Sequence, residues 1–569
     1  MGAASLLEPP VVDEKLVEEP LIDELLVDES LFAEPLVEAV FCDEKLKKAT
    51  IGKMGMVAFS LILMVGLAYI ATQLSRDLSV VHTASVFPYL LLGLALLIAL
   101  GFEFVNGFHD TANAVATVIY TNSLEPHVAV VYSGILNFIG VLLSSGAVAF
   151  TILHLFPSEM ILKMDDGLGF AMIFALLLAA ILWNLATWYG GLPTSSSHTL
   201  IGSIVGVVVV FHWMQGGSAA AGINWEPMKK VFEALLISPV VGFTMAGVLF
   251  LLFKLTAKDE RLYTAPKGDT PPPLYIRALL ILTCGGVSYA HGSNDGQKGM
   301  GLIMLILVGT MPTAYALNHA MGAGPVQEFV VSSTQLAGVL DKVAPQAAAV
   351  PDAESELKKF VTTKRYDPEV VVALRQTVID VRNQAQAAGT LANVPQNMQT
   401  KMRGQMYLSG ETLRLLTSGG LTGSASPKIT AADAKVVASY QKDLDRSTQF
   451  IPSWVKVAVA LALGLGTMIG WKRIVVTVGE KIGKTRMTYA QGASAQMVAM
   501  TTILAAGAYG LPVSTTHVLS SSVAGSMTAN RSGLQWETIR NIATAWVLTL
   551  PTAALHSGSL FWLFNSLVK

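Results

Sequence analysis

Long apolar runs, separated by short polar or glycine-rich breaks, extend through most of the chain after residue 50. Runs of this length and composition are typical of helices that cross a membrane. We therefore predict an all-α integral membrane protein. The predicted spans lie at 54–74, 87–122, 128–154, 168–190, 193–212, 231–255, 277–310, 453–471, 488–510, 512–528 and 541–566.

Two of these runs, 87–122 and 277–310, are too long for one ordinary span. As straight helices they would measure roughly 50 Å, whereas the hydrocarbon core of a bilayer is about 30 Å thick. Each run contains an Asp in a glycine-containing motif, Asp110 or Asp295. We expect both helices to be broken at this motif, which a membrane tolerates only where the break lines a protein cavity.

Other parts of the chain are polar. Residues 1–49 form an acidic, proline-interrupted tract that predicts a disordered tail, with a partner-docking segment as the alternative. Residues 311–452, rich in Ala, Gln and Val, have helical periodicity and predict an α-helical extramembrane insert of unassigned role. The predicted organisation begins with the tail (1–49), followed by transmembrane repeat 1 with an extra N-terminal span (50–255) and a cytoplasmic linker (256–276). Repeat 2 begins with its first broken helix (277–310), is interrupted by the insert (311–452) and continues with its remainder (453–569).

Composition agrees with a membrane protein. Of 569 residues, 52% are hydrophobic and 14% are charged, whereas soluble domains contain about 25% charged residues. A net charge of −2 gives no indication of a nucleic-acid partner. Cys42 and Cys284 are far apart, so they predict neither a disulfide framework nor a thiolate metal site, and no cofactor is indicated. The first apolar run follows about fifty residues of the acidic tract, so no cleavable signal is expected.

Two motifs occur twice. Residues 191–206 and 510–525 agree at 8 of 16 positions without a gap, and Gly107-Phe108-His109-Asp110 has a counterpart in Gly292-Ser293-Asn294-Asp295. Basic residues are concentrated in 254–277 and 472–486, which places both segments in the cytoplasm by the positive-inside rule. The two repeats then enter the membrane from opposite sides, and the insert lies outside. Inverted repeats with duplicated polar breaks are typical of transporters whose substrate site lies between the halves.

Asp110 and Asp295 are the first candidate site residues, because a carboxylate at membrane depth costs several kcal/mol unless it is paired or solvated. The alternative is an Asp at an ordinary helix end near the headgroups. Duplication of the motif favours the functional interpretation. Further polar side chains flank each Asp: His109, Thr111 and Asn113 in the first copy, and Asn294, Gln297 and Lys298 in the second.

The second element is the sequence Pro-x-Ser-[Ser/Thr]-[Ser/Thr]-His at 193–198 and 512–517. Proline followed by Ser or Thr predicts a capped helix start, and its free backbone N–H groups form an anion site. Hydroxyls from both copies are expected to surround a tetrahedral oxyanion. The alternative is a capped helix with a structural His. The candidate ligands are Thr194, Ser195, Ser196, Ser514, Thr515 and Thr516.

These segments identify a resemblance. FEFVNGFHDTANAVATVIYTNSL, NLATWYGGLPTSSSHTLIGSIVG, SYAHGSNDGQKGMGLIMLILVG and GLPVSTTHVLSSSVAG resemble the Pit family of inorganic phosphate transporters, most closely its bacterial low-affinity members. The resemblance covers the membrane segments but not the acidic tail, and it says little about the insert. It implies a two-repeat helical fold in the bacterial inner membrane, with phosphate bound at the midplane and alternating access.

The sequence departs from the family pattern Gly-x-Asn-Asp-x-Ala-Asn. His109 replaces the first Asn in repeat one, and Gln297-Lys298 replaces Ala-Asn in repeat two. Asn137 and Gln496 stand at what look like the positions of carboxylates in sodium-coupled members. Lost carboxylates remove sodium ligands and Lys298 adds a fixed cation, so we expect coupling to protons, with Asp110, Asp295, Gln297 and Lys298 as coupling residues.

Charge balance makes the expectation concrete. Two ionised Asp and HPO₄²⁻ sum to −4, which a buried site does not tolerate. Three positive contributions would complete the balance: Lys298, one proton, and a divalent metal that travels with phosphate as a neutral complex. Asp110 and Asp295 would bind the metal or the proton. Lys298 and Asp295 are spaced to pair on one helix face, although Lys298 snorkelling to the surface is the alternative.

Other functions stay open at this stage. They are sodium-coupled phosphate symport, sulfate transport, and an intramembrane hydrolase using Ser195 and His198, which share a helix face. Two equivalent motif copies and the absence of a nucleophile elbow in the sequence argue against the hydrolase, so we expect no enzyme. The expected partners are inorganic phosphate, protons, divalent metal ions and the lipid bilayer, with a homo-oligomer left open.

Overall fold

The computed structural model describes residues 52–568 apart from 79–86, 157–159, 161–167, 218–222, 224, 267, 269, 312–314, 316, 345–348 and 419–429. The acidic tract predicted as a disordered tail lies outside these described residues. Within them the regular elements are helices, and an isolated β bridge joins Gly483 and Leu534. The all-α prediction is therefore confirmed.

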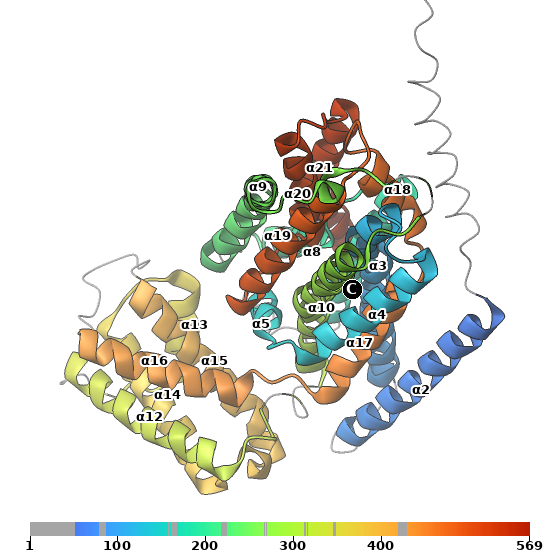
Figure 1. Cartoon of the computed structure of the whole chain (residues 1–569). Coiled ribbons are helices and arrows are strands. Elements are labelled where there is room, and N and C mark those ends of the chain that lie inside the picture. Colours follow the sequence, from blue (N-terminus) through green and yellow to red (C-terminus); the bar gives the residue numbers. More distant parts are fainter. Residues whose placement is uncertain are drawn as a thin grey trace, which may run out of the picture. The chain divides into compact units, whose positions relative to one another are not determined.

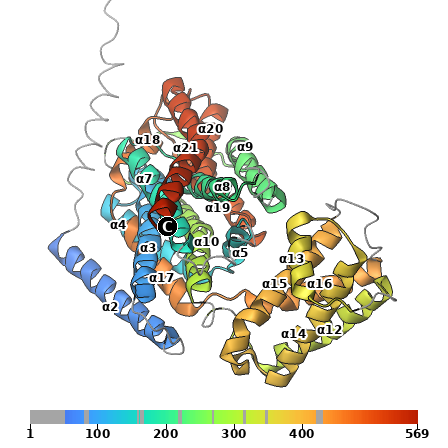
Figure 2. The same cartoon turned by 180° about the vertical axis from the view of Figure 1, so that it is seen from behind.

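Eight of the described helices are long and apolar enough to cross a membrane. Figure 1 shows the helices of the apolar part packed together, and Figure 2 shows them from behind. The helices of this apolar part, which include the eight candidate spans and shorter helices, are α2 (Lys53–Leu78), α3 (Phe87–Tyr120), α4 (Pro126–Leu143), α5 (Ala147–Leu153), α7 (Leu168–Tyr189), α8 (Ser196–Met214), α9 (Trp225–Thr256), α10 (Leu274–Thr310), α17 (Ser453–Thr467), α18 (Lys472–Glu480), α19 (Tyr489–Ala508), α20 (Thr515–Ala529) and α21 (Trp536–Val568).

The predicted breaks at the Asp motifs are wrong. α3 and α10 each run without interruption through Asp110 or Asp295. The glycine of each motif serves close packing instead, since a Cβ at Gly107 would overlap the backbone of α17 and one at Gly292 that of α4. The predicted span 128–154 is also wrong as one helix, because Gly146, at φ +89, separates α4 from α5.

The chain breaks at the other duplicated motif. Gly191 and Gly510 have φ of +65 and +68, values that glycine adopts without strain. Ser195 and Ser514, which directly precede α8 and α20, have extended backbone conformations. Each copy of the motif therefore reverses or redirects the chain and begins a new helix.

The packing of the two halves is duplicated as well. Gly107 of α3 faces the carbonyl oxygen of Leu463 in α17, and Gly292 of α10 faces that of Asn137 in α4. In each half a motif glycine thus contacts the second helix of the other half. Likewise α8 packs on α21 and α20 packs on α9. These contacts match two structural repeats, whereas their opposite orientation in the membrane stays a prediction.

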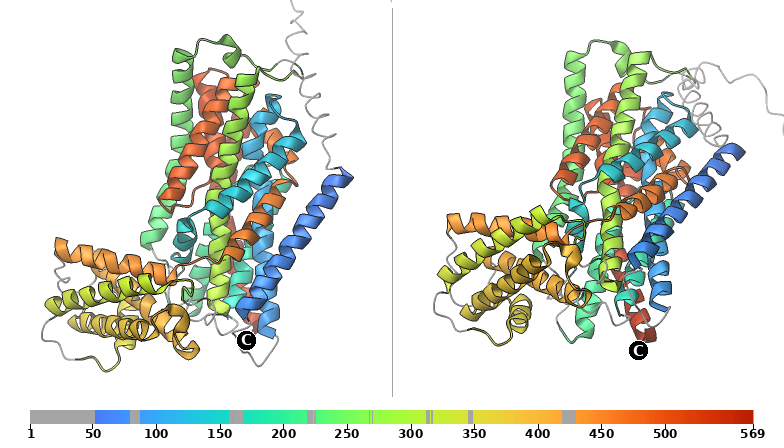
Figure 3. Two further views of the ribbon diagram at one scale, coloured as in Figure 1. Left: turned by 60° about the horizontal axis from the view of Figure 1, so that its bottom comes forward. Right: turned by 90° about the horizontal axis from the view of Figure 1, so that it is seen from below.

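The insert is helical, as predicted. It contains α12 (Ala323–Val343), α13 (Ala353–Thr363), α14 (Pro368–Ala388), α15 (Gln396–Ser418) and α16 (Ala431–Thr448). Asp352, Asp367 and Thr430 cap the starts of α13, α14 and α16. These helices share an apolar core that includes Phe329 and Tyr440. Figure 3 shows them as one bundle, and its extramembrane location stays a prediction. Short 3-10 turns are η2 (Glu260–Tyr263) and η3 (Leu391–Asn393).

Candidate functional site

The two Pro-x-Ser motifs form capped helix starts, as predicted. The Ser195 hydroxyl accepts the N–H of His198 at 3.1 Å, and the Ser514 hydroxyl accepts the N–H of His517 at 3.1 Å. A capping side chain satisfies one of the N–H groups that have no partner within the helix. Ser196 and Thr516 lie in the first turns of α8 and α20, directly after these caps.

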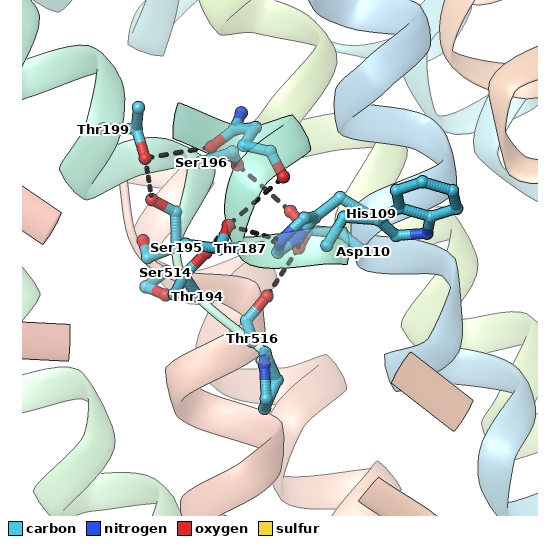
Figure 4. Close-up of polar contacts among 12 residues, drawn as sticks. His109, Asp110, Thr187, Thr194, Ser195, Ser196, Thr199, Ser514 and Thr516 are labelled. Carbon is cyan, nitrogen blue, oxygen red and sulfur yellow. Dashed lines mark hydrogen bonds and ion pairs between the residues drawn. The ribbon is translucent and has the colours of Figure 1, made fainter. Parts of the chain in front are cut away.

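Asp110 of α3 lies between the starts of α8 and α20 (Figure 4). Thr516 donates to its Oδ1 at 2.6 Å, and Ser196 donates to its Oδ2 at 3.0 Å. His109 Nδ1 lies 3.1 Å from Oδ1, while Nε2 of the same ring lies 3.3 Å from the Thr194 hydroxyl. Asp110 is therefore held by hydroxyls from both repeats and by a histidine.

Asp295 of α10 lies on the other side of Ser196. The Ser196 hydroxyl is 3.3 Å from Asp295 Oδ2 as well as 3.0 Å from Asp110. A hydroxyl has one proton, so it satisfies only one of the two carboxylates at a time. The two carboxylates of the duplicated motif consequently share one hydrogen-bond donor, which brings them close together in a buried site.

Lys298 forms the ion pair with Asp295 that the spacing predicts, at 2.8 Å. Its ammonium also donates to the Ser197 hydroxyl and to the Val513 carbonyl oxygen at 3.3 Å. Lys298 is 0% exposed, so the alternative of a snorkelling side chain is wrong. Lys298 places a fixed positive charge between α8, α10 and the loop before α20.

His291, one turn before Asp295, faces both carboxylates. Its Nε2 lies 3.8 Å from Asp110 Oδ2 and 3.6 Å from Asp295 Oδ2. Asp110, His291 and Asp295 each offer a ligand atom, and these atoms lie within 4.8 Å of one another. Two carboxylates and an imidazole are a donor set that divalent metals accept.

A chain of hydrogen bonds fixes the tautomer of His291. The Thr467 hydroxyl donates to the Leu463 carbonyl and accepts from the Asn137 amide nitrogen at 3.1 Å. The Asn137 amide oxygen, 2.8 Å from His291 Nδ1, then accepts the Nδ1 proton. A neutral His291 therefore turns the Nε2 lone pair toward the two carboxylates. Three acceptors facing one another repel unless a cation or proton lies between them.

The other predicted residues lie around this centre with different partners. The Asn294 amide donates to the Leu511 carbonyl at 3.1 Å, and Gln297 Oε1 accepts the N–H of Val148 at 2.9 Å. These two amides anchor α10 to the loop before α20 and to the start of α5. Thr515 is buried at the start of α20. The side chain of Asn113 lies outside the described residues.

Sequence reasoning did not select the buried residues Glu103 and His291, and it named His109 as a polar neighbour of Asp110 without making it a site residue. Each carried a signal. Glu103 is an ionisable residue inside an apolar run, which is a functional candidate by default. His109 neighbours Asp110, and His291 lies four residues before Asp295 on the same helix face.

Comparisons with known proteins identify the family. A family model described as the phosphate transporter family matches residues 106–557. The low-affinity inorganic phosphate transporter PitA of Escherichia coli (strain K12) is 40% identical over 491 residues, which cover 83% of this chain and 96% of that protein. PitB of the same strain is 39% identical over 500 residues, covering 85% and 98%.

A relative from Buchnera aphidicola subsp. Acyrthosiphon pisum, also named as a low-affinity inorganic phosphate transporter, is 41% identical over 486 residues, covering 83% and 96%. Among solved structures, a sodium-dependent phosphate transporter aligns with 84% of this chain and 99% of its own, with 19% identity and a TM-score of 0.46.

Proposed function

The chain belongs to the phosphate transporter family, and from this premise we propose that it carries inorganic phosphate together with protons by alternating access. Its family and the eight candidate spans among the described residues make it a multi-pass protein of the bacterial inner membrane. The close relatives are named as transporters, so the chain is a transporter and the hydrolase alternative is set aside.

The observation that carries the proposal is the shared centre of Asp110, Asp295 and His291 between the starts of α8 and α20. Three acceptors suit a cation, and two helix N-termini with their hydroxyls suit an oxyanion. A metal phosphate complex presents both. The divalent metal would lie on the carboxylates and His291, and the phosphate oxygens would face Ser196, Thr516 and the first-turn N–H groups.

Charge supports a neutral cargo. Ionised Asp110 and Asp295 with protonated Lys298 leave the site at −1, which would repel a bare phosphate dianion. A neutral metal phosphate avoids this repulsion, and one further proton neutralises the site. This balance supports symport of the complex with a proton.

The amides at the family's carboxylate positions argue against sodium. The Gln496 amide donates to the Ala114 carbonyl at 2.8 Å and accepts from the Thr283 hydroxyl at 2.6 Å. A carboxylate here would face the Ala114 oxygen, an arrangement that needs a bridging cation. The amide nitrogen takes the place of that cation, and Asn137 is satisfied in the same way by His291 and Thr467.

Access to the site requires movement, since Asp110 is 2% exposed and Asp295 is 0% exposed. A cavity of about 610 Å³ is lined by Leu511 and Thr151, together with residues of α15 and α16 in the insert. The Leu511 carbonyl accepts the amide proton of Asn294. Leu511 therefore lines this cavity and also contacts the motif that bears Asp295, which makes the cavity a candidate approach route for phosphate.

Purified protein in liposomes tests the proposal. We expect labelled phosphate to enter sodium-free vesicles when the outside is acidic, to enter faster with Mg²⁺, and to be unaffected by excess sulfate. A chelator should reduce uptake, since it removes the metal partner. Uptake that begins only when sodium is added would show the chain to be a sodium-coupled member, and competition by sulfate would overturn the choice of substrate.

A further inference from the structure

Each Pro-x-Ser motif ends in a histidine, His198 in the first copy and His517 in the second, and the site described above uses neither. In the structure these two side chains meet, with ring centroids 4.4 Å apart. His198 lies in the first turn of α8 and His517 in the first turn of α20. The duplicated motif therefore brings one histidine from each repeat together where the two helices begin.

The two histidines differ in their hydrogen bonds. The Ser195 hydroxyl accepts the backbone N–H of His198 and lies 2.9 Å from Nδ1 of the same residue, to which it can donate its own proton. Ser514 makes the matching bond to the backbone N–H of His517. Nε2 of His517, however, has no hydrogen-bond partner among the described residues. The ring of His198 is thus held by its own cap, whereas His517 has a nitrogen available for another partner.

This nitrogen belongs to a deeply buried side chain, since His517 is 2% exposed. A buried polar atom without a partner is costly, and native proteins nearly always satisfy it with protein, water or a ligand. Thr515, two residues earlier and also buried, has a hydroxyl with no partner in the described part of the chain. Two such atoms in the first turn of α20 indicate that a ligand binds there.

Stacking fixes the orientation of the His517 ring. Its centroid lies 3.9 Å from that of Trp546 of α21, as well as 4.4 Å from that of His198. Two rings so close to one imidazole lie on opposite faces of it, because on one face they would overlap. The Trp546 N–H in turn donates to the Pro193 carbonyl at 2.9 Å. With both faces covered, His517 can reach a ligand only through its edge, which carries the nitrogens.

The ring lies close to the carboxylates of the site. Thr516, the residue before His517, donates to Asp110 (Figure 4), and the charge of Asp110 acts on the His517 ring. The start of a helix carries a partial positive charge, which attracts an anion and disfavours a metal cation. The ligand expected at Thr515 and His517 is therefore an oxyanion.

We propose that His517 donates a hydrogen bond from Nε2 to an oxygen of the transported phosphate, an inference that rests on the phosphate site proposed above. The Thr515 hydroxyl is a second donor to the same anion. Trp546 and His198 hold the imidazole in place, so little ordering is needed when phosphate arrives. The histidines of the two motifs thus have separate tasks: His517 binds phosphate, and His198 supports its ring.

His517→Phe tests this, because it keeps a ring for the stack and removes the N–H. The assay is exchange of labelled for unlabelled phosphate in liposomes, with the same pH, sodium and Mg²⁺ on both sides, so that it needs no ion gradient. We expect the phosphate concentration for half-maximal exchange to rise roughly ten- to a hundredfold, with the maximal rate nearly unchanged.

Two further variants are matched controls. His198→Phe makes the same chemical change at the equivalent position of the other repeat, and its half-maximal concentration should stay close to that of the wild type. His517→Gln places an amide N–H near the position of Nε2 and should recover most of the affinity for phosphate. Equal losses in both Phe variants, or a Gln variant as weak as His517→Phe, would show that the rings act only as packing.

The outcomes separate the two proposals. If the wild type shows no saturable phosphate exchange, the proposed function is wrong and this inference falls with it. If the wild type exchanges phosphate and His517→Phe has the same half-maximal concentration, only the role of His517 is wrong. An increased requirement for Mg²⁺ with unchanged phosphate dependence would also overturn it, by making His517 a metal ligand.

Thr515→Val keeps the test decisive if the His517 variants do not fold. Valine has nearly the shape of threonine but lacks the hydroxyl, so the half-maximal phosphate concentration should rise here as well. An unchanged value would contradict a phosphate site at the start of α20.

Discussion

Asp110 and Asp295 occupy equivalent positions in a duplicated motif, yet their surroundings differ. Asp110 accepts hydrogen bonds from Thr516 and Ser196, and no lysine or arginine among the described residues forms an ion pair with it. Asp295 forms a 2.8 Å ion pair with Lys298. One carboxylate is thus held by neutral donors, and the other is compensated by a fixed charge.

The matching hydroxyls show how this difference arises. Thr516 in the second Pro-x-Ser motif donates to Asp110 at 2.6 Å. Its counterpart in the first motif, Ser197, instead donates to the Val513 carbonyl at 2.7 Å and accepts from Lys298. In the second case Lys298 lies between the Ser197 hydroxyl and the Asp295 carboxylate. Duplicated helices therefore supply matching positions, and one substitution assigns them different charges.

The largest effect is expected for Asp110→Asn. The centre between α8 and α20 then keeps Asp295 as its one carboxylate for a cation, so uptake of labelled phosphate should be abolished while the protein still reaches the membrane. Asp295→Asn should abolish uptake as well and leave Lys298 buried without its partner. Near-normal uptake by either variant would remove that carboxylate from the mechanism.

Lys298→Met removes the charge that distinguishes the surroundings of Asp295 from those of Asp110. Removing one member of a buried ion pair costs about 3–5 kcal/mol, because the remaining charge is unpaired. We expect a lower melting temperature in detergent and a severe loss of uptake. The double variant Asp295→Asn/Lys298→Met should regain thermal stability without regaining transport. A single variant as stable as the wild type would show that the pair does not compensate Asp295.

Ser196→Ala and Ser195→Ala are neighbouring, matched changes with smaller effects. Ser196 donates to the shared carboxylates, and a lost hydrogen bond to a charged group costs about 1.5–3 kcal/mol. The phosphate concentration that gives half-maximal uptake should therefore rise roughly ten- to a hundredfold in Ser196→Ala. Ser195 accepts the cap bond of α8, and its loss costs about 0.5–2 kcal/mol of stability. Equal half-saturation concentrations in both variants would contradict these separate roles.

Some of these contacts and elements could be predicted from the sequence, and others could not. Lys298 and Asp295 were predictable as a pair because three residues on a helix share a face. The caps at Ser195 and Ser514 were predictable because capping is a local interaction. The continuity of α3 and α10 was not, since Gly107 and Gly292 fit both a break and a close helix contact. Only the carbonyl groups of α17 and α4 beside them decide between these possibilities.

The sequence by itself determined the membrane class, the duplication, the carboxylates and the hydroxyl-rich helix starts. These follow from composition and from interactions within a few residues along the chain. The tertiary structure alone decided that Ser196 bridges Asp110 and Asp295, that Asn137 fixes the tautomer of His291, and that Glu103 lies against Gly299. Each of these contacts joins helices far apart in sequence, and their geometry depends on how all the neighbouring helices pack at once.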